Sequence, residues 1–261
     1  MSKKTAKKLV IANWKMNPVL EKDAEKLFKS VVKGVHALKN TEVVVCPPFI
    51  YFDKLKKVSK KINLGAQDAF FGDRGPFTGE VSGEMLENIG IKYVILGHSE
   101  RRALGEENLL INKKLKGVLS SGLIPILCVG DEERDVNHEY FNFIKTQIEE
   151  GLNGINKDLL SKVVIAYEPI WALSTTLGRK DATPADSYEM NIFIKKIISD
   201  KFGVKTEMPR ILYGGSVSEK NILDFIINGG IDGVLVGGAS LDSKKFLEII
   251  KIVETQKNEI N

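Results

Sequence analysis

Cysteine and histidine are scarce in this sequence, which has two cysteines and three histidines among 261 residues. Cys46 and Cys128 lie in apolar segments, at 43–46 and 124–128, so we expect both to be buried as small hydrophobic side chains. Two cysteines are too few for a disulfide framework. No histidine and cysteine share the spacing of a zinc site, so the sequence predicts no metal site.

Long apolar runs and a strong excess of one charge are also absent. No stretch approaches the roughly 18 apolar residues of a membrane span, and no apolar segment of a signal peptide follows the first lysines. We therefore expect no membrane partner and a cytoplasmic location. The formal net charge is only +4, which argues against a nucleic-acid partner. The one basic cluster lies in residues 1–8, which we expect to form a solvated Lys-rich N-terminal extension.

Short apolar segments alternate with helical patterns along the whole chain. Strands are predicted at 10–12, 43–46, 62–65, 93–96, 124–128, 163–167, 211–213 and 233–236. Most are apolar throughout, which is typical of parallel strands covered on both faces. Helical patterns lie between them, among others at 21–38, 108–120, 140–152, 184–201, 219–227 and 244–253. Thr183, Pro184 and Asp186 together predict a capped helix start.

Eight such units predict the fold. The length is close to the ~250 residues of an α/β barrel, and no linker or change of composition divides the chain. We therefore expect an α/β protein with a single (β/α)8 TIM barrel, in one catalytic domain over 1–261. An open doubly wound sheet is the alternative.

Polar residues and glycines gather where the predicted strands end. In barrels this C-terminal edge holds the active site, so the distribution predicts an enzyme. The residues concerned are Asn13, Lys15, Gln67, Asp68, His98, Glu100, Glu168, 214–216 and 237–240.

Two glycine-rich loops follow the last two strands, at 214–216 and 237–240. Glycine lets backbone N–H groups approach a phosphate closely, and barrels often bind phosphate at this position. Tight turns are the alternative reason for glycine in either loop. Because both loops follow neighbouring strands, we favour phosphate binding.

Three side chains at these strand ends suit proton transfer. Glu168 follows an apolar strand and can act as a general base, or else pair with a neighbouring cation. His98 can transfer protons or serve a structural role. Lys15 can neutralise an anionic substrate or lie at the surface.

Seven segments resemble the triosephosphate isomerase family, in that family's order and over nearly the whole chain. They are NWKMN at 13–17, AQD at 66–68, FTGE at 77–80, GHSERR at 97–102, AYEPIWA at 166–172, YGGSV at 213–217 and LVGGASL at 235–241. The resemblance implies a cofactor-free aldose–ketose isomerase, an intramolecular oxidoreductase of glycolysis and gluconeogenesis. It would interconvert dihydroxyacetone phosphate and glyceraldehyde 3-phosphate.

The same resemblance implies roles for matching residues. Glu168 resembles the base that moves a proton between two substrate carbons. His98 resembles the electrophile that polarises the carbonyl and moves protons between the oxygens of the enediol. Lys15 and Asn13 resemble the residues that bind substrate and stabilise the oxyanion. Glu100 is similar to a buried carboxylate near that lysine.

The resemblance further implies a phosphate site and a homodimer. Ser216, Gly237 and Gly238 resemble the phosphate-contacting residues. Thr78 resembles the tip of a loop that reaches the neighbouring subunit, with a tetramer left open. Cys128 is similar to a residue that supports the site.

The stretch between Glu168 and Thr183 is too long for an ordinary strand-to-helix loop and resembles the family's lid. Its candidate lid residues are Pro169, Ile170, Trp171, Ser174 and Gly178. The tip at 173–181 has about three extra residues, so we expect a lid that closes with altered kinetics. Two other functions remain as alternatives: a different isomerase on a phosphate-binding barrel, and a catalytically impaired barrel with a binding role.

Overall fold

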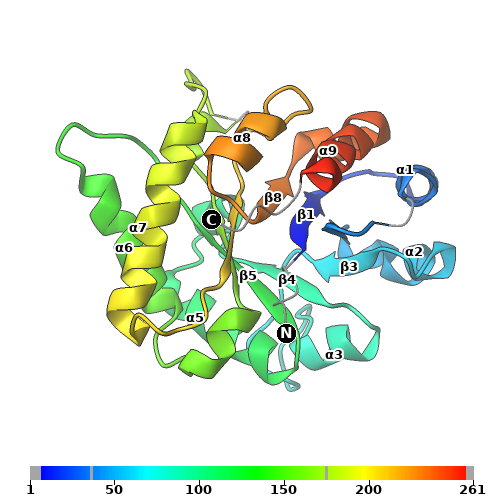
Figure 1. Cartoon of the computed structure of the whole chain (residues 1–261). Coiled ribbons are helices and arrows are strands. Elements are labelled where there is room, and N and C mark those ends of the chain that lie inside the picture. The colour runs from blue at the N-terminus through cyan, green and yellow to red at the C-terminus, as the bar shows by residue number, and fades with distance from the viewer. Residues whose placement is uncertain (1–6, 36–37, 174–175, 257–261) are drawn as a thin grey trace, which may run out of the picture.

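A closed barrel of parallel strands forms the centre of the molecule (Figure 1). The computed structural model describes residues 7–35, 38–173 and 176–256. The strands are β1 (Lys8–Asn13), β2 (Thr41–Cys46), β3 (Asn63–Ala66), β4 (Tyr93–Leu96), β5 (Ile124–Val129), β6 (Val164–Tyr167), β7 (Arg210–Tyr213) and β8 (Gly233–Val236). β8 pairs with β1, Leu9 opposite Gly233. This closure confirms the predicted barrel and excludes the open sheet.

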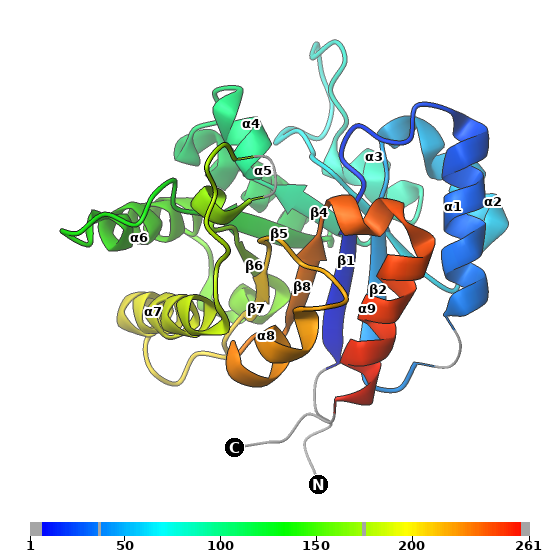
Figure 2. The same cartoon turned by 90° about the horizontal axis from the view of Figure 1, so that it is seen from above.

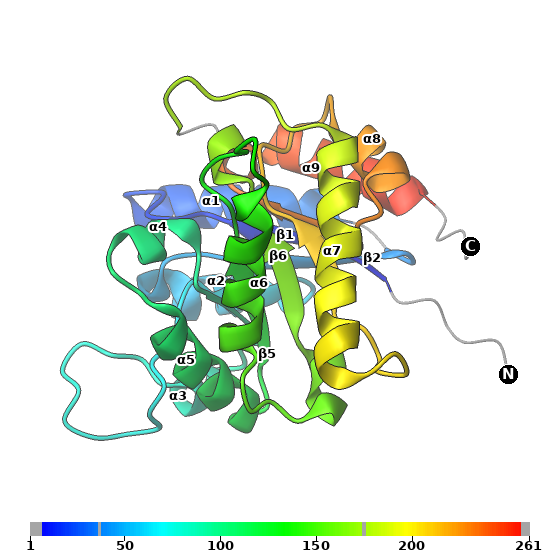
Figure 3. The same cartoon turned by 90° about the vertical axis from the view of Figure 1, so that its left-hand side faces the viewer.

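Helices cover the outside of the barrel. They are α1 (Glu21–Gly34), α2 (Phe52–Val58), α3 (Gly83–Asn88), α4 (Ser99–Ala103), α5 (Asn108–Ser120), α6 (Glu139–Gly151), α7 (Pro184–Phe202), α8 (Ile222–Asn228) and α9 (Ser243–Thr255). The 3-10 turns within these described ranges are η1 (Phe49–Tyr51), η2 (Lys157–Lys162), η3 (Ile170–Ala172) and η4 (Gly238–Leu241). Figure 3 shows α5, α6 and α7 side by side on one flank. In the described part of the chain, no helix combines the length and apolar character that crossing a membrane requires.

The predicted elements differ from the structure mainly at their ends. α1 ends at Gly34 and not at 38, because Val35 adopts an extended backbone. The sequence did not predict α2, α3 and α4, which have at most seven residues and are too short to show a helical period. The predicted cap of α7 is confirmed, since Thr183 and Asp186 form a reciprocal capping box. β1 begins at Lys8, which the sequence had assigned to the N-terminal extension, and the Lys8 ammonium donates to the Ile231 carbonyl (2.6 Å).

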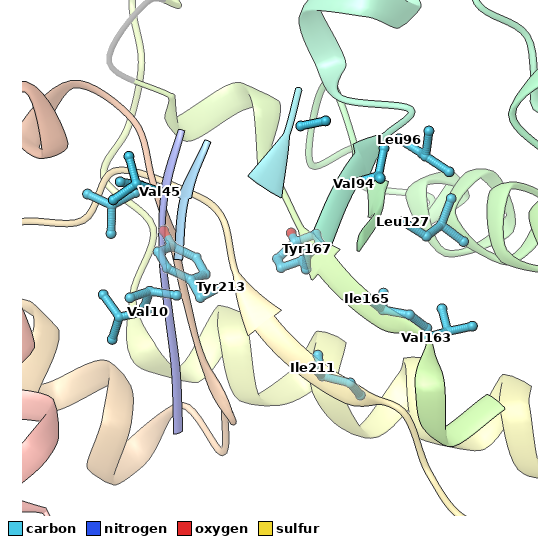
Figure 4. Packing of buried hydrophobic residues seen from close by; sticks show 14 of the residues in the cluster. Val10, Val45, Val94, Leu96, Leu127, Val163, Ile165, Tyr167, Ile211 and Tyr213 are labelled. Atoms are coloured by element: carbon cyan, nitrogen blue, oxygen red, sulfur yellow. The ribbon is translucent and has the colours of Figure 1, made fainter. Parts of the chain in front are cut away.

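Alternate residues of each strand face two different apolar layers, because side chains alternate across a strand. In β1, Leu9 and Ile11 point into the barrel, whereas Val10 and Ala12 pack under the helices. Figure 4 shows part of this outer layer, with Val10 and the strand neighbours Tyr167 and Tyr213. The rigid barrel carries the strand ends on which the candidate site is built.

A buried network of charges ties α4 and α5 to the segment after β3. The Lys114 ammonium is 3% exposed and donates to both Asp68 oxygens (2.9 and 2.8 Å) and to Glu106 (2.6 Å). Arg101 of α4 pairs with the same two carboxylates. Burial raises the pKa of Asp68, against the opposing effect of the Lys114 hydrogen bonds. The network therefore orients α4, which begins directly after His98.

We expect Lys114→Met to lower the free energy of unfolding by about 3–5 kcal/mol, because it leaves two buried carboxylates sharing Arg101 alone. Urea denaturation at one fixed protein concentration measures the change. Lys116→Met, at an exposed position of the same helix, is the control and should shift stability by at most about 0.5 kcal/mol. Equal stability of the two variants would contradict the structural role of the network.

Candidate active site

A cavity of about 170 Å³ opens at the C-terminal ends of the strands. The sequence-predicted residues that line it are Asn13, Lys15, His98, Glu168, Ser216, Gly237 and Gly238. They come from the ends of β1, β4, β6, β7 and β8, so residues more than 200 positions apart share one cavity. Leu173 of the predicted lid also lines it.

Glu168 and His98 face each other inside this cavity. The Glu168 carboxylate is 3% exposed, and its Oε1 lies 3.0 Å from Nε2 of His98. Glu168 directly follows β6, and its backbone N–H donates to the carbonyl of Val129 at the end of β5 (2.8 Å). Gly130 and Gly214 flank it on the neighbouring strands, and a Cβ on Gly214 would lie 3.0 Å from the Glu168 Cγ. Gly214 therefore makes room for the Glu168 side chain, whereas Gly130 makes room for the Glu168 backbone carbonyl.

Backbone N–H groups of α4 orient both side chains. The Ser99 N–H donates to Oε2 of Glu168 (3.0 Å), and the Glu100 N–H donates to Nδ1 of His98 (3.2 Å). Because Nδ1 accepts a hydrogen bond, the neutral imidazole carries its proton on Nε2 and donates toward Glu168. Sequence reasoning missed Ser99, whose one signal was its place between His98 and Glu100.

Lys15 is held in a conformation that non-glycine residues rarely adopt, with φ of 53°. Its backbone N–H donates to Oδ1 of Asn13 (3.0 Å), and Nε2 of Gln67 donates to its carbonyl (2.8 Å). Its ammonium lies 2.7 Å from Oε1 of Glu100. The sequence predicted a buried carboxylate there, but the Glu100 side chain is 52% exposed. This prediction is wrong, because Glu100 stands in the first turn of α4 with its side chain toward solvent.

The two glycine-rich loops differ in what their glycines do. A Cβ on Gly215 would clash with the Tyr213 hydroxyl, so this glycine allows close packing. By contrast, nothing described lies within 4 Å of a Cβ on Gly238, and a Cβ on Gly237 would lie 3.5 Å from the Lys15 side chain. Close packing, which sequence reasoning did not consider, therefore explains glycine at 214–215, whereas Gly237 and Gly238 leave space for a ligand beside Lys15.

The start of the predicted lid is anchored to Asp131, which sequence reasoning did not include in the site. The hydroxyl of Tyr167 and the indole N–H of Trp171 donate to its two oxygens (2.8 and 3.1 Å). Burial raises the pKa of Asp131, against the effect of these hydrogen bonds. Pro169 and Ile170 lead into η3. Gly178 has a positive φ of 68°, and Ser174 lies outside the described residues.

Two further predicted residues do not line the cavity. Cys128 is fully buried, burial raises the pKa of its thiol, and Arg102 donates to its carbonyl (3.2 Å). Its side chain therefore serves packing. Thr78 is exposed in the loop after β3, which projects from the body beside α3 (Figures 2 and 3).

Comparisons with known proteins agree with this geometry. The model of the triosephosphate isomerase family matches residues 8–253. The chain belongs to the triosephosphate isomerase family. Proteins named triosephosphate isomerase from Endomicrobium trichonymphae and Dictyoglomus thermophilum are each 41% identical to it, and the alignments cover 94% of this chain and 98% and 99% of theirs.

A solved structure confirms the barrel independently. A triosephosphate isomerase from Bartonella henselae superposes with a TM-score of 0.80 at 32% identity, over 94% of this chain and 98% of that one. The family membership makes this chain an isomerase. Within the ranges that the structure describes, no three histidine, cysteine or acidic side chains cluster as metal ligands would.

Proposed function

We propose that this triosephosphate isomerase family member interconverts dihydroxyacetone phosphate and D-glyceraldehyde 3-phosphate, as a single catalytic domain in glycolysis and gluconeogenesis. One observation carries the proposal. A buried carboxylate, a histidine N–H and an ammonium group, those of Glu168, His98 and Lys15, converge on one cavity with Gly237 and Gly238 at its other side. The reaction moves a proton between neighbouring carbons, and these groups suffice for it.

Each group has a step in this reaction. The Glu168 carboxylate removes a proton from the carbon beside the substrate carbonyl, and the His98 Nε2–H donates to the oxygen where negative charge develops. An enediol or enediolate results. His98 takes the proton from the hydroxyl that becomes the new carbonyl and gives one to the other oxygen, while the Glu168 carboxylate returns the carbon-derived proton to the neighbouring carbon. When substrate binds, before these steps, it takes the place of the 3.0 Å contact between the Glu168 carboxylate and His98 Nε2. Hydrogen moves as a proton throughout, so no redox cofactor takes part.

Lys15 and the phosphate loops hold the anionic substrate during this exchange. The Lys15 ammonium stabilises the oxyanion, and Asn13 supports the backbone of Lys15 (3.0 Å). The phosphate group fits beside Ser216, Gly237 and Gly238, where a Cβ on Gly238 would meet open space. The lid excludes water, which protects the intermediate from phosphate elimination.

A coupled assay of glyceraldehyde 3-phosphate isomerisation by the purified protein tests the proposal. Turnover supports it. No turnover by a correctly folded protein would contradict it and would favour the impaired barrel with a binding role. Turnover of another phosphorylated sugar only would favour the different isomerase.

We also propose a homodimer in which the loop of Thr78 reaches the neighbouring subunit. Phe77 is 44% exposed beside Thr78, and its ring packs against that of Phe70 at a tilt of 45°, with the ring centroids 4.5 Å apart. This contact shapes a preformed projection. Met16 and Ile50, which follow β1 and β2 at the same end of the barrel, are 89% and 77% exposed. Burying such apolar surface against a second copy supports association.

Thr78→Arg should weaken this dimer at least roughly tenfold, because it places a charge where the loop would be buried. Light scattering after size exclusion, across a dilution series, measures the dissociation. Thr146→Arg, on an exposed face of α6, is the control and should leave the dimer intact. A parent that is monomeric, or a variant that dimerises like the parent, would refute the proposed loop contact.

A cytoplasmic location completes the proposal. Cys46 and Cys128 are both free and buried, and burial raises the pKa of both thiols. Unpaired thiols are typical of proteins in a reducing compartment.

A further inference from the structure

The extended tip of the lid places an arginine against the phosphate loop. Nη1 of Arg179 donates to Oγ of Ser216 (3.1 Å), and this hydroxyl in turn donates to the Ala172 carbonyl (2.9 Å). Ser216 lines the cavity, so the guanidinium reaches the rim of the phosphate site from the lid side. Arg179 lies in the segment 173–181, where the chain is longer than its resemblance to the family predicts.

The cavity has little positive charge of its own. Among the described residues that line it, Lys15 is the one cation, and its ammonium already lies 2.7 Å from Glu100. The glycine loops offer neutral N–H donors. A phosphate ester carries about −1.5 to −2 charges at pH 7, so a second cation at this end would strengthen binding.

We propose that Arg179 is a substrate-binding residue that contacts the phosphate group of the triose phosphate. This inference rests on the proposed function. The Arg179 guanidinium already donates to Oγ of Ser216. A phosphate oxygen bound at Ser216 lies about 3 Å from this same Oγ. A small rotation of the Arg179 side chain therefore transfers its hydrogen bond from Ser216 to the phosphate. The planar guanidinium can donate two parallel hydrogen bonds to phosphate oxygens.

The ion pair that Arg179 forms in this structure is weak enough to be replaced by a ligand. Its ion pair with Asp181 spans 3.3 Å, and the Asp181 side chain is 82% exposed. Ion pairs this exposed contribute little stability. The phosphate group carries more negative charge than the exposed Asp181 carboxylate and is therefore the stronger partner for the guanidinium.

Steady-state kinetics with an inhibition series tests this role. Arg179→Gln should raise both the KM for glyceraldehyde 3-phosphate and the inhibition constant of inorganic phosphate about tenfold, the loss of one charge-assisted hydrogen bond. The kcat value should change much less. Arg179→Lys should recover part of the loss. Lys180→Gln removes the same charge from the exposed neighbouring residue and should leave both constants unchanged.

Each other outcome has a distinct meaning. Unchanged constants in Arg179→Gln, or an equal effect of Lys180→Gln, would overturn the proposal. A lower KM in Arg179→Gln would also overturn it, since the bond to Ser216 would then hold the empty site closed. If the parent lacks isomerase activity, the proposed function fails, while calorimetric titration of parent and variants with inorganic phosphate still tests the Arg179 contact.

Discussion

Replacing Glu168 by glutamine is expected to lower kcat by roughly three to four orders of magnitude, the upper range for losing a general base. The amide cannot remove a proton, although its oxygen can still accept the hydrogen bond from the Ser99 N–H. KM should therefore change far less than kcat. The coupled isomerase assay, with enzyme concentration raised to detect residual turnover, measures the effect.

Two companion variants make this result specific. Glu168→Asp keeps the carboxylate but retracts it from His98 by one methylene, so kcat should fall less, by about a hundredfold. Glu132→Gln, at an exposed position that does not line the cavity, should match the parent. A kcat in Glu168→Gln within a factor of ten of the parent would show that another group is the base.

Lys15→Met is expected to lower kcat/KM by at least about a thousandfold. The substitution keeps most of the side-chain stem but removes the positive charge that offsets the developing oxyanion, and losing one such donor costs about 10²–10³ in kcat alone. KM should rise as well, because Lys15 is the one cation among the described residues lining the cavity. Steady-state kinetics separates the two contributions.

Stability distinguishes this catalytic effect from unfolding. The partner of Lys15 is the exposed carboxylate of Glu100, so losing the ion pair should cost at most about 1 kcal/mol. Lys22→Met, at an exposed position of α1, controls for the change in net charge. Activity near that of the parent in Lys15→Met, or a collapse of its thermal midpoint, would contradict the role given to this lysine.

Local patterns in the chain predicted the eight strands and favoured the barrel over an open doubly wound sheet. Apolar segments of three to five residues mark buried parallel strands because both faces of such a strand are covered. All eight predicted strands match observed ones within two residues at either end. The strand order also predicted which edge of the barrel holds Asn13, His98 and Glu168. Polar residues directly after parallel strands all lie at the C-terminal end of the barrel.

Contacts between distant segments could not be predicted in this way. The Ser99 N–H meets Glu168 across 69 positions, and Arg179 meets Ser216 across 37. Whether Glu100 is buried, and whether a glycine faces a side chain or open space, depends on how neighbouring strands and loops pack after the barrel closes. Composition and periodicity indicate whether a single segment is buried or exposed. They carry no information on which atoms of two distant segments come within hydrogen-bond distance, because that depends on how the closed barrel packs.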